Sequence, residues 1–87
     1  LPESILFGSG EARVRPEALP FLKALAQILI EMDRHVRVLG HTDNVPIRTA
    51  QFPSNWELSA MRAVMVVRIF SELNEIPITH LSATGFA

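Results

Sequence analysis

The chain has 87 residues, of which 48% are hydrophobic and 20% are charged, with eight basic side chains, nine acidic ones and no cysteine. These values predict one small domain with its own core, and they exclude a multidomain enzyme, a disordered chain, disulfide bridges and thiol chemistry. The net charge of −1 and the scattered basic residues exclude the concentrated positive field that nucleic acid binding requires, so we expect no nucleic acid partner.

The first half of the sequence predicts a strand, a helix and a second strand. The short apolar run Ser4–Phe7 ends at Gly8–Gly10, which is typical of a brief strand followed by a turn. From Arg15 to about Met32, apolar residues recur every three or four positions after an early proline, which indicates a helix. The alternating, β-branched segment His35–Leu39 then predicts a strand.

The second half predicts a long loop, a second helix and a third strand. Residues 44–53 contain two prolines and no sustained period, so we expect a loop of a length that usually carries function or disorder. Ser54 and Glu57 have the spacing of a capping box, which predicts a helix from Ser54 through Leu73. The segment His80–Phe86 has the character of a strand.

The β-α-β-α-β order of these elements predicts where polar side chains meet. Two strands that are separated by a helix usually run parallel with a right-handed crossover. The end of the second strand, at Thr42 and Asp43, is therefore expected beside the start of the second helix. Ligands of open sheets commonly bind at such strand ends.

Arg62 is the residue of the second helix that most needs an explanation. On a helical wheel it falls within the apolar stripe formed by Leu58, Met65 and Ile69. A buried guanidinium cannot be deprotonated and needs an anionic partner, for which Asp43 is the nearest candidate. The two residues form either a structural ion pair or a site for a zwitterion, in which arginine holds a carboxylate and aspartate holds an ammonium. Asn55, at the helix start, serves as a cap or as a further ligand contact.

Other kinds of site have weaker support in the sequence. His41 and Asp43 could both ligate zinc, but a metal site needs at least three protein ligands, and His35 and His80 have no spacing that brings them in. No Gly-x-Ser-x-Gly elbow accompanies Ser59, and the Gly8–Gly10 turn lacks the lysine of a phosphate loop. We therefore expect a non-enzymatic protein without a metal or a cofactor.

Two sequence motifs carry a family resemblance: Gly40-His41-Thr42-Asp43-Asn44 and Asn55-Trp56-Glu57-Leu58-Ser59-Ala60-Met61-Arg62-Ala63. They resemble the signature of the OmpA-like peptidoglycan-binding domain, and the similarity extends over nearly the whole chain. The resemblance implies an α+β two-layer sandwich with helices packed on one face of a mixed sheet. It also implies that Asp43 and Arg62 hold the ammonium and the carboxylate of diaminopimelate in a peptidoglycan stem peptide, with Thr42, Asn55 and Leu58 lining the site.

Within this family, the segments 42–47 and 52–59 are most similar to the periplasmic domain of flagellar stator proteins of the MotB type. That similarity implies a cell wall anchor for motility, which forms a homodimer in the periplasm. It further implies a full-length protein that is held in the inner membrane with a MotA-like channel partner. Residues 1–87 are expected to be a single, C-terminally truncated domain that lacks its last strand, which would leave a strand edge exposed.

Three alternatives remain open from the sequence. The same peptidoglycan-binding domain could instead anchor an outer-membrane protein, a Pal-like lipoprotein or a secretion-system component. A hydrolase could act on peptidoglycan through His41 and Asp43. The domain could instead be a dimerisation or assembly module, in which Asp43 and Arg62 only hold a helix in place.

Overall fold

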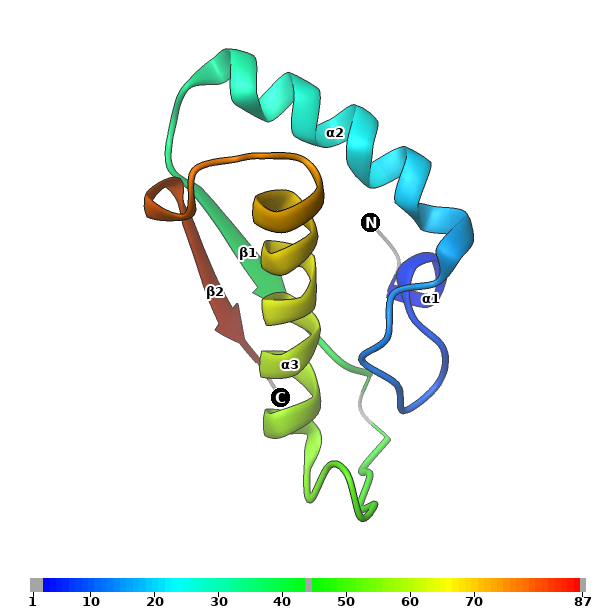
Figure 1. The fold of residues 1–87 in the computed structure, drawn as a ribbon. Helices are drawn as coiled ribbons and strands as arrows, with labels where there is room; N and C mark the ends of the chain where they lie inside the picture. Colours follow the sequence, from blue (N-terminus) through cyan, green and yellow to red (C-terminus); the bar gives the residue numbers. More distant parts are fainter. Residues whose placement is uncertain (1–2, 44, 87) are drawn as a thin grey trace.

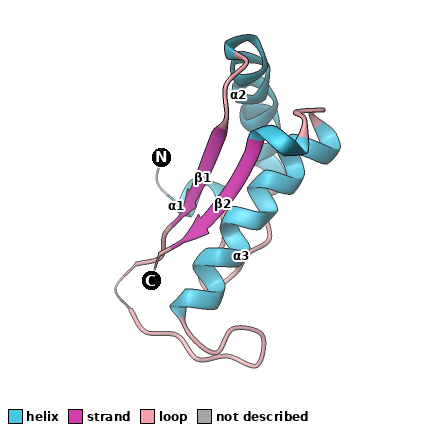
Figure 2. Cartoon of the chain, turned by 90° about the vertical axis from the view of Figure 1, so that its left-hand side faces the viewer, coloured by secondary structure: helices cyan, strands magenta, loops and turns pink. Residues whose placement is uncertain are grey.

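The computed structural model describes residues 3–43 and 45–86 as a two-layer α+β fold, which confirms the expected architecture (Figure 1). Two strands form one layer, and the two long helices lie behind them in Figure 2. The main elements are α1 (Glu3–Leu6), α2 (Leu19–Met32), β1 (Val36–Gly40), α3 (Asn55–Arg68) and β2 (Leu81–Gly85). Short 3₁₀ turns at Pro16–Ala18 and Ile78–His80 and a π-helical turn at Ile69–Leu73 complete the set.

The predicted first strand is wrong. Residues Glu3–Leu6 form the short helix α1, and Phe7 makes only an isolated antiparallel bridge with Val14. The Leu6 carbonyl accepts a hydrogen bond of 2.7 Å from the Arg15 backbone N–H, so this segment pairs with the turn that follows it. An apolar run of four residues has no period that separates a strand from a helical turn, which is why the sequence was ambiguous here.

The two strands of the sheet are parallel, as their connection through α3 predicts. The register pairs Val36 with Leu81 and runs to Gly40 with Gly85. β1 pairs with no second strand among the described residues. An apolar groove of about 810 Å³ runs along β1, and α2, β1 and α3 supply most of its lining.

The core lies between the sheet and the helices. Leu22 and Ala26 of α2 meet Val66 of α3, the Phe70 ring and Leu81 of β2 in one buried cluster. Leu22 and Ala26 belong to the spacing of three and four that predicted α2. The helix ends at Met32, and the next residue, Asp33, has a left-handed backbone with φ of 49°. The expected end near Met32 is therefore confirmed.

Two glycines set the distance between α3 and the sheet. Gly40 and Gly85 face each other in register at the ends of the two strands. A Cβ atom on Gly40 would lie 2.1 Å from the Ser59 carbonyl oxygen, and one on Gly85 would lie 2.5 Å from the Ala60 backbone nitrogen. Ser59 has no exposed surface. The absence of side chains at this pair thus lets the helix backbone rest directly on the strands.

The N-terminus of α3 is capped as the sequence predicts. The Ser54 hydroxyl accepts a hydrogen bond of 3.2 Å from the Trp56 backbone N–H and donates one to the Glu57 carboxylate. This hydroxyl is the main reason that the pKa of Glu57 lies below its ordinary value, and backbone N–H groups at the helix start lower it further. The cap fixes the position at which α3 begins, beside the end of β1.

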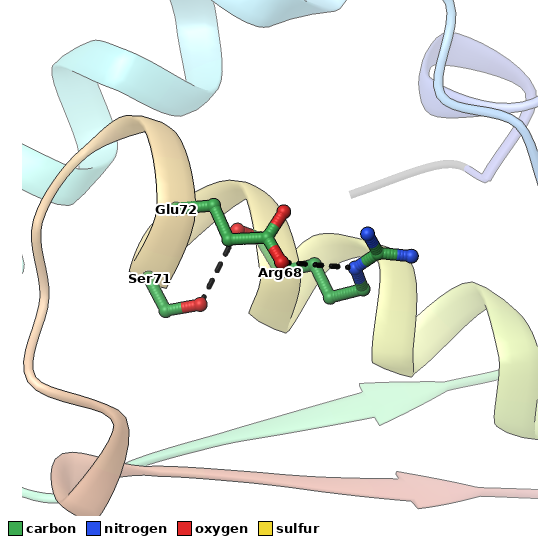
Figure 3. A network of polar contacts seen from close by, with 3 residues as sticks. All are labelled: Arg68, Ser71 and Glu72. Atoms are coloured by element: carbon green, nitrogen blue, oxygen red, sulfur yellow. Dashed lines mark hydrogen bonds and ion pairs between the residues drawn. The ribbon is translucent and has the colours of Figure 1, made fainter.

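The opposite end of α3 carries a small surface network, shown in Figure 3. The Arg68 Nε atom lies 3.2 Å from a carboxylate oxygen of Glu72, and the Ser71 hydroxyl donates to the Arg68 carbonyl at 3.3 Å. Both charged side chains are more than half exposed, so this pair contributes little to stability.

No helix among the described residues has both the length and the apolar character that crossing a bilayer requires.

Candidate ligand-binding cleft

A cleft of about 380 Å³ lies where the end of β1, the start of α3 and the turn after α1 come together. In Figure 1 the end of β1, the first turns of α3 and the chain that follows α1 approach one another below the sheet. All five residues that were predicted for the site line this cleft: Thr42, Asp43, Asn55, Leu58 and Arg62. Its size falls within the range of roughly 300–1,000 Å³ that is typical of small-molecule sites.

Arg62 lines the cleft and is only 6% exposed. Its Nε atom donates to the Glu11 carbonyl at 2.8 Å, and its Nη2 atom donates to the Gly8 carbonyl at 3.1 Å. The guanidinium carbon lies 5.1 Å from the centre of the Phe7 ring, at cation–π distance. Arg62 therefore ties the 8–11 turn to α3.

Sequence reasoning missed these carbonyl partners. It named Asp43 as the counter-charge of Arg62, whereas the hydrogen bonds above go to backbone oxygens of the 8–11 turn. The burial of Arg62 inside the apolar stripe of α3 is confirmed. Backbone acceptors leave no mark in a sequence, and the only signal for this contact was the Gly8-Ser9-Gly10 turn itself.

Asp43 stands at the mouth of the cleft with its side chain exposed. One carboxylate oxygen accepts a hydrogen bond of 3.1 Å from the Val45 backbone N–H, in the manner of an Asx-turn. Across the same loop, the Asn55 side-chain nitrogen donates to the Val45 carbonyl at 3.1 Å. The strand end and the helix start are thus joined through one residue of the loop between them.

Two side-chain oxygens of the cleft residues are buried without a hydrogen-bond partner among the described residues. They are Thr42 Oγ1 and Asn55 Oδ1. An unpaired buried polar atom costs about 1–3 kcal/mol, so native proteins rarely keep one without a reason. Together with the Asp43 carboxylate, these atoms supply three acceptors in one cleft, which suits a ligand ammonium with its three donors.

The loop wall of the cleft has a small apolar core of its own. Phe52 is 3% exposed and packs with Ala12 and Leu58, and Ile47 lies against this cluster. The Phe52 carbonyl accepts from the Thr49 backbone N–H at 2.9 Å, which closes the loop into a turn. The long loop predicted for residues 44–53 is therefore anchored, in its described part, from both the 8–15 segment and α3.

His41, which the sequence offered as a metal ligand or hydrolase residue, and the nearby Trp56 both lie outside the lining of the cleft. His41 stacks on Phe86, with ring centres 4.9 Å apart and planes inclined by 8°. Trp56 is 61% exposed and does not line the cleft. Among the residues that the structure describes, no group of three His, Asp or Glu side chains is arranged to hold a metal ion.

Comparison with known proteins finds matches along nearly the whole chain. Residues 6–87 match the OmpA family. Motility protein B of Bacillus subtilis (strain 168) is 39% identical over 87 residues, which cover 99% of this chain and 33% of that protein. The chain thus spans about a third of this curated relative.

Solved structures match over almost the same length. The cell wall anchor of the T6SS from Pseudomonas aeruginosa matches with a TM-score of 0.90 and 36% identity, covering 99% of this chain and 59% of that one. The periplasmic domain of Helicobacter pylori MotB matches with a TM-score of 0.89 and 25% identity, covering 99% of this chain and 56% of that one.

Proposed function

Because this chain belongs to the OmpA family, we propose that it binds peptidoglycan non-covalently through the cleft at the end of β1. The part of the wall that it recognises is the diaminopimelate of the stem peptide, whose free end carries an ammonium and a carboxylate. In this role the domain makes and breaks no covalent bond. Neither a metal nor a cofactor takes part.

The observation that carries this proposal is the set of acceptors in the cleft. Thr42 Oγ1 and Asn55 Oδ1 are buried without partners among the described residues, and the Asp43 carboxylate lies at the same mouth. A bound ammonium donates to all three groups and so removes the cost of the two unpaired oxygens. The ligand carboxylate is then directed toward the Arg62 side of the cleft.

The biological role that we propose is a cell wall anchor in the periplasm. Motility protein B of B. subtilis and the periplasmic domain of H. pylori MotB favour a flagellar stator, in which a grip on the wall resists the force that turns the rotor. In that setting the full-length protein forms a dimer in the inner membrane, beside a MotA-like channel. The T6SS cell wall anchor favours a second candidate, the same grip in a secretion system.

Co-sedimentation with purified sacculi tests the binding function. The wild-type chain is expected to pellet with the sacculi, and Asp43→Asn should weaken binding at least tenfold, because hydrogen bonds to charged groups contribute about 1.5–3 kcal/mol. Asp33→Asn is the matched control, since Asp33 is the other aspartate of the chain and ends α2 away from the cleft. Circular dichroism establishes that each variant is folded.

Three outcomes would contradict the proposal. If folded wild-type protein stays in the supernatant, the domain is better explained as a dimerisation or assembly module, which sedimentation equilibrium would reveal. If Asp43→Asn binds as the wild type does, the cleft is not the wall-binding site. Release of soluble fragments from the sacculi, lost in His41→Ala, would instead establish the hydrolase.

A further inference from the structure

Arg15 is a second arginine in the cleft, and neither the sequence motifs nor the site described above assigns it a role. Its backbone N–H donates to the Leu6 carbonyl at 2.7 Å, and its Nε atom donates to the Ser4 carbonyl at 3.2 Å. The neighbouring residue Val14 bridges to Phe7. The base and the Nε edge of the Arg15 side chain are therefore both fixed against the α1 segment.

The outer edge of the Arg15 guanidinium remains available for binding. Its two terminal nitrogens make no hydrogen bond or ion pair with the side chains and backbone that the structure describes. A guanidinium that is oriented through Nε presents these nitrogens as a fork, which matches the two oxygens of a carboxylate. The Nε hydrogen bond lowers part of the entropy cost of ordering this exposed side chain when it binds a ligand.

The charges of the cleft indicate what this fork binds. The charged residues of its lining are Arg15, Asp43 and Arg62, two cations and one anion. A ligand head group with one ammonium and one carboxylate would engage Asp43 and Arg62, and it would leave the Arg15 fork without an anion. Resting on the proposed function, we infer that Arg15 binds a second carboxylate of the same ligand, so that the cleft selects stem peptides with a free carboxylate beside the diaminopimelate zwitterion.

Two soluble peptides and two variants test this inference. The first peptide is an N-acetylated stem tripeptide of alanine, γ-linked glutamate and diaminopimelate with all its carboxylates free. In the second, the carboxylates outside the diaminopimelate zwitterion are amidated. The variants are Arg15→Gln and the matched control Arg13→Gln, because Arg13 is exposed on the same segment and does not line the cleft. Calorimetry measures the affinity of each protein for each peptide.

We expect amidation to weaken binding to the wild type and to Arg13→Gln about three- to tenfold, the range for a partly exposed, fork-shaped ion pair. Arg15→Gln should bind the free peptide more weakly by the same factor and should not distinguish the two peptides. This loss of discrimination is specific, since a general loss of positive charge would affect both variants equally.

Three results would overturn the inference. If wild-type protein binds the two peptides with equal affinity, the second carboxylate plays no part in recognition, and the proposed function is unaffected. If Arg13→Gln and Arg15→Gln lose affinity for the free peptide equally, the effect of Arg15 is one of net charge alone. Failure of folded wild-type protein to bind sacculi and both peptides would overturn the proposed function and this inference together.

Discussion

Substitution of Gly40 by alanine is the sharpest test of how the fold builds the cleft. The added Cβ would lie 2.1 Å from the Ser59 carbonyl oxygen and 3.1 Å from the Ala63 backbone nitrogen. To bring the first distance to the 3.4 Å of ordinary contact, the backbone of α3 must retreat from β1 by about 1.3 Å. The obstacle is helix backbone, which cannot rotate away as a side chain can.

The expected cost follows from two opposing effects. Overpacking of this kind typically costs 1–3 kcal/mol, and sometimes more. Alanine restricts the unfolded chain more than glycine does, which by itself would raise the free energy of unfolding by about 0.4–1 kcal/mol. Because the clash is severe, we expect a net loss near 2 kcal/mol, which lowers the melting temperature of a domain of this size by roughly 8–16 °C. Binding to sacculi should weaken as well, since Asn55 and Leu58 move away from Thr42.

Thermal and urea unfolding followed by circular dichroism measure the effect. Gly8→Ala is the matched control, because its added Cβ would meet only the end of the Glu11 side chain, which is exposed and free to rotate. It should stay within about 0.5 kcal/mol of the wild type or gain slightly. If Gly40→Ala is as stable as Gly8→Ala, close approach of α3 to the strands does not determine the position of the cleft.

Two further predictions concern the cap and the loop wall. Because its folded-state pKa is lowered, Glu57 contributes stability that is present above its ordinary pKa of 4.5 and is lost as the pH falls through the lowered folded value. Ser54→Ala should therefore raise the pKa of Glu57, measured by NMR titration, and cost about 0.5–2 kcal/mol of unfolding free energy; an unchanged pKa would contradict the assigned hydrogen bond. Phe52→Ala should cost about 3–5 kcal/mol in urea unfolding, because this 3% exposed ring fills the apolar core of the loop. The exposed residue Phe21, at 47%, provides the control, and equal losses in Phe21→Ala and Phe52→Ala would show that the loop has no core of its own.

Sequence periodicity was sufficient for the long elements and insufficient for the short ones. The helix α2, both strands and the capped start of α3 lie close to where apolar spacing and cap residues predicted them. The helix that begins at α3 was expected to reach Leu73. The chain does remain helical to that residue, because a π-helical turn at Ile69–Leu73 follows α3. Asn74 follows directly, and its side chain donates to the Ile69 carbonyl at 3.1 Å, which closes the end of the helix.

The site was predictable where it depends on side-chain type and unpredictable where it depends on backbone. The parallel topology brought Thr42 and Asp43 to the start of α3, and five predicted residues therefore share one cleft. The carbonyls of Gly8 and Glu11, which hold Arg62, carry no side-chain signature. Their position depends on α1 and the turn after it, the segment for which the sequence predicted the wrong element.

This dependence determines which substitution can separate binding from folding. Arg62 is buried and donates to the carbonyls of Glu11 and Gly8, which lie 51 and 54 residues earlier in the chain. Removing its side chain would release the 8–11 turn and would also remove any contact between Arg62 and a ligand. A loss of wall binding in an Arg62 variant would therefore be ambiguous. Asp43 is exposed, and its carboxylate bonds only the Val45 N–H among the described residues. Because asparagine can retain that acceptor while losing the charge, Asp43→Asn isolates the interaction with a ligand ammonium from the architecture that surrounds it.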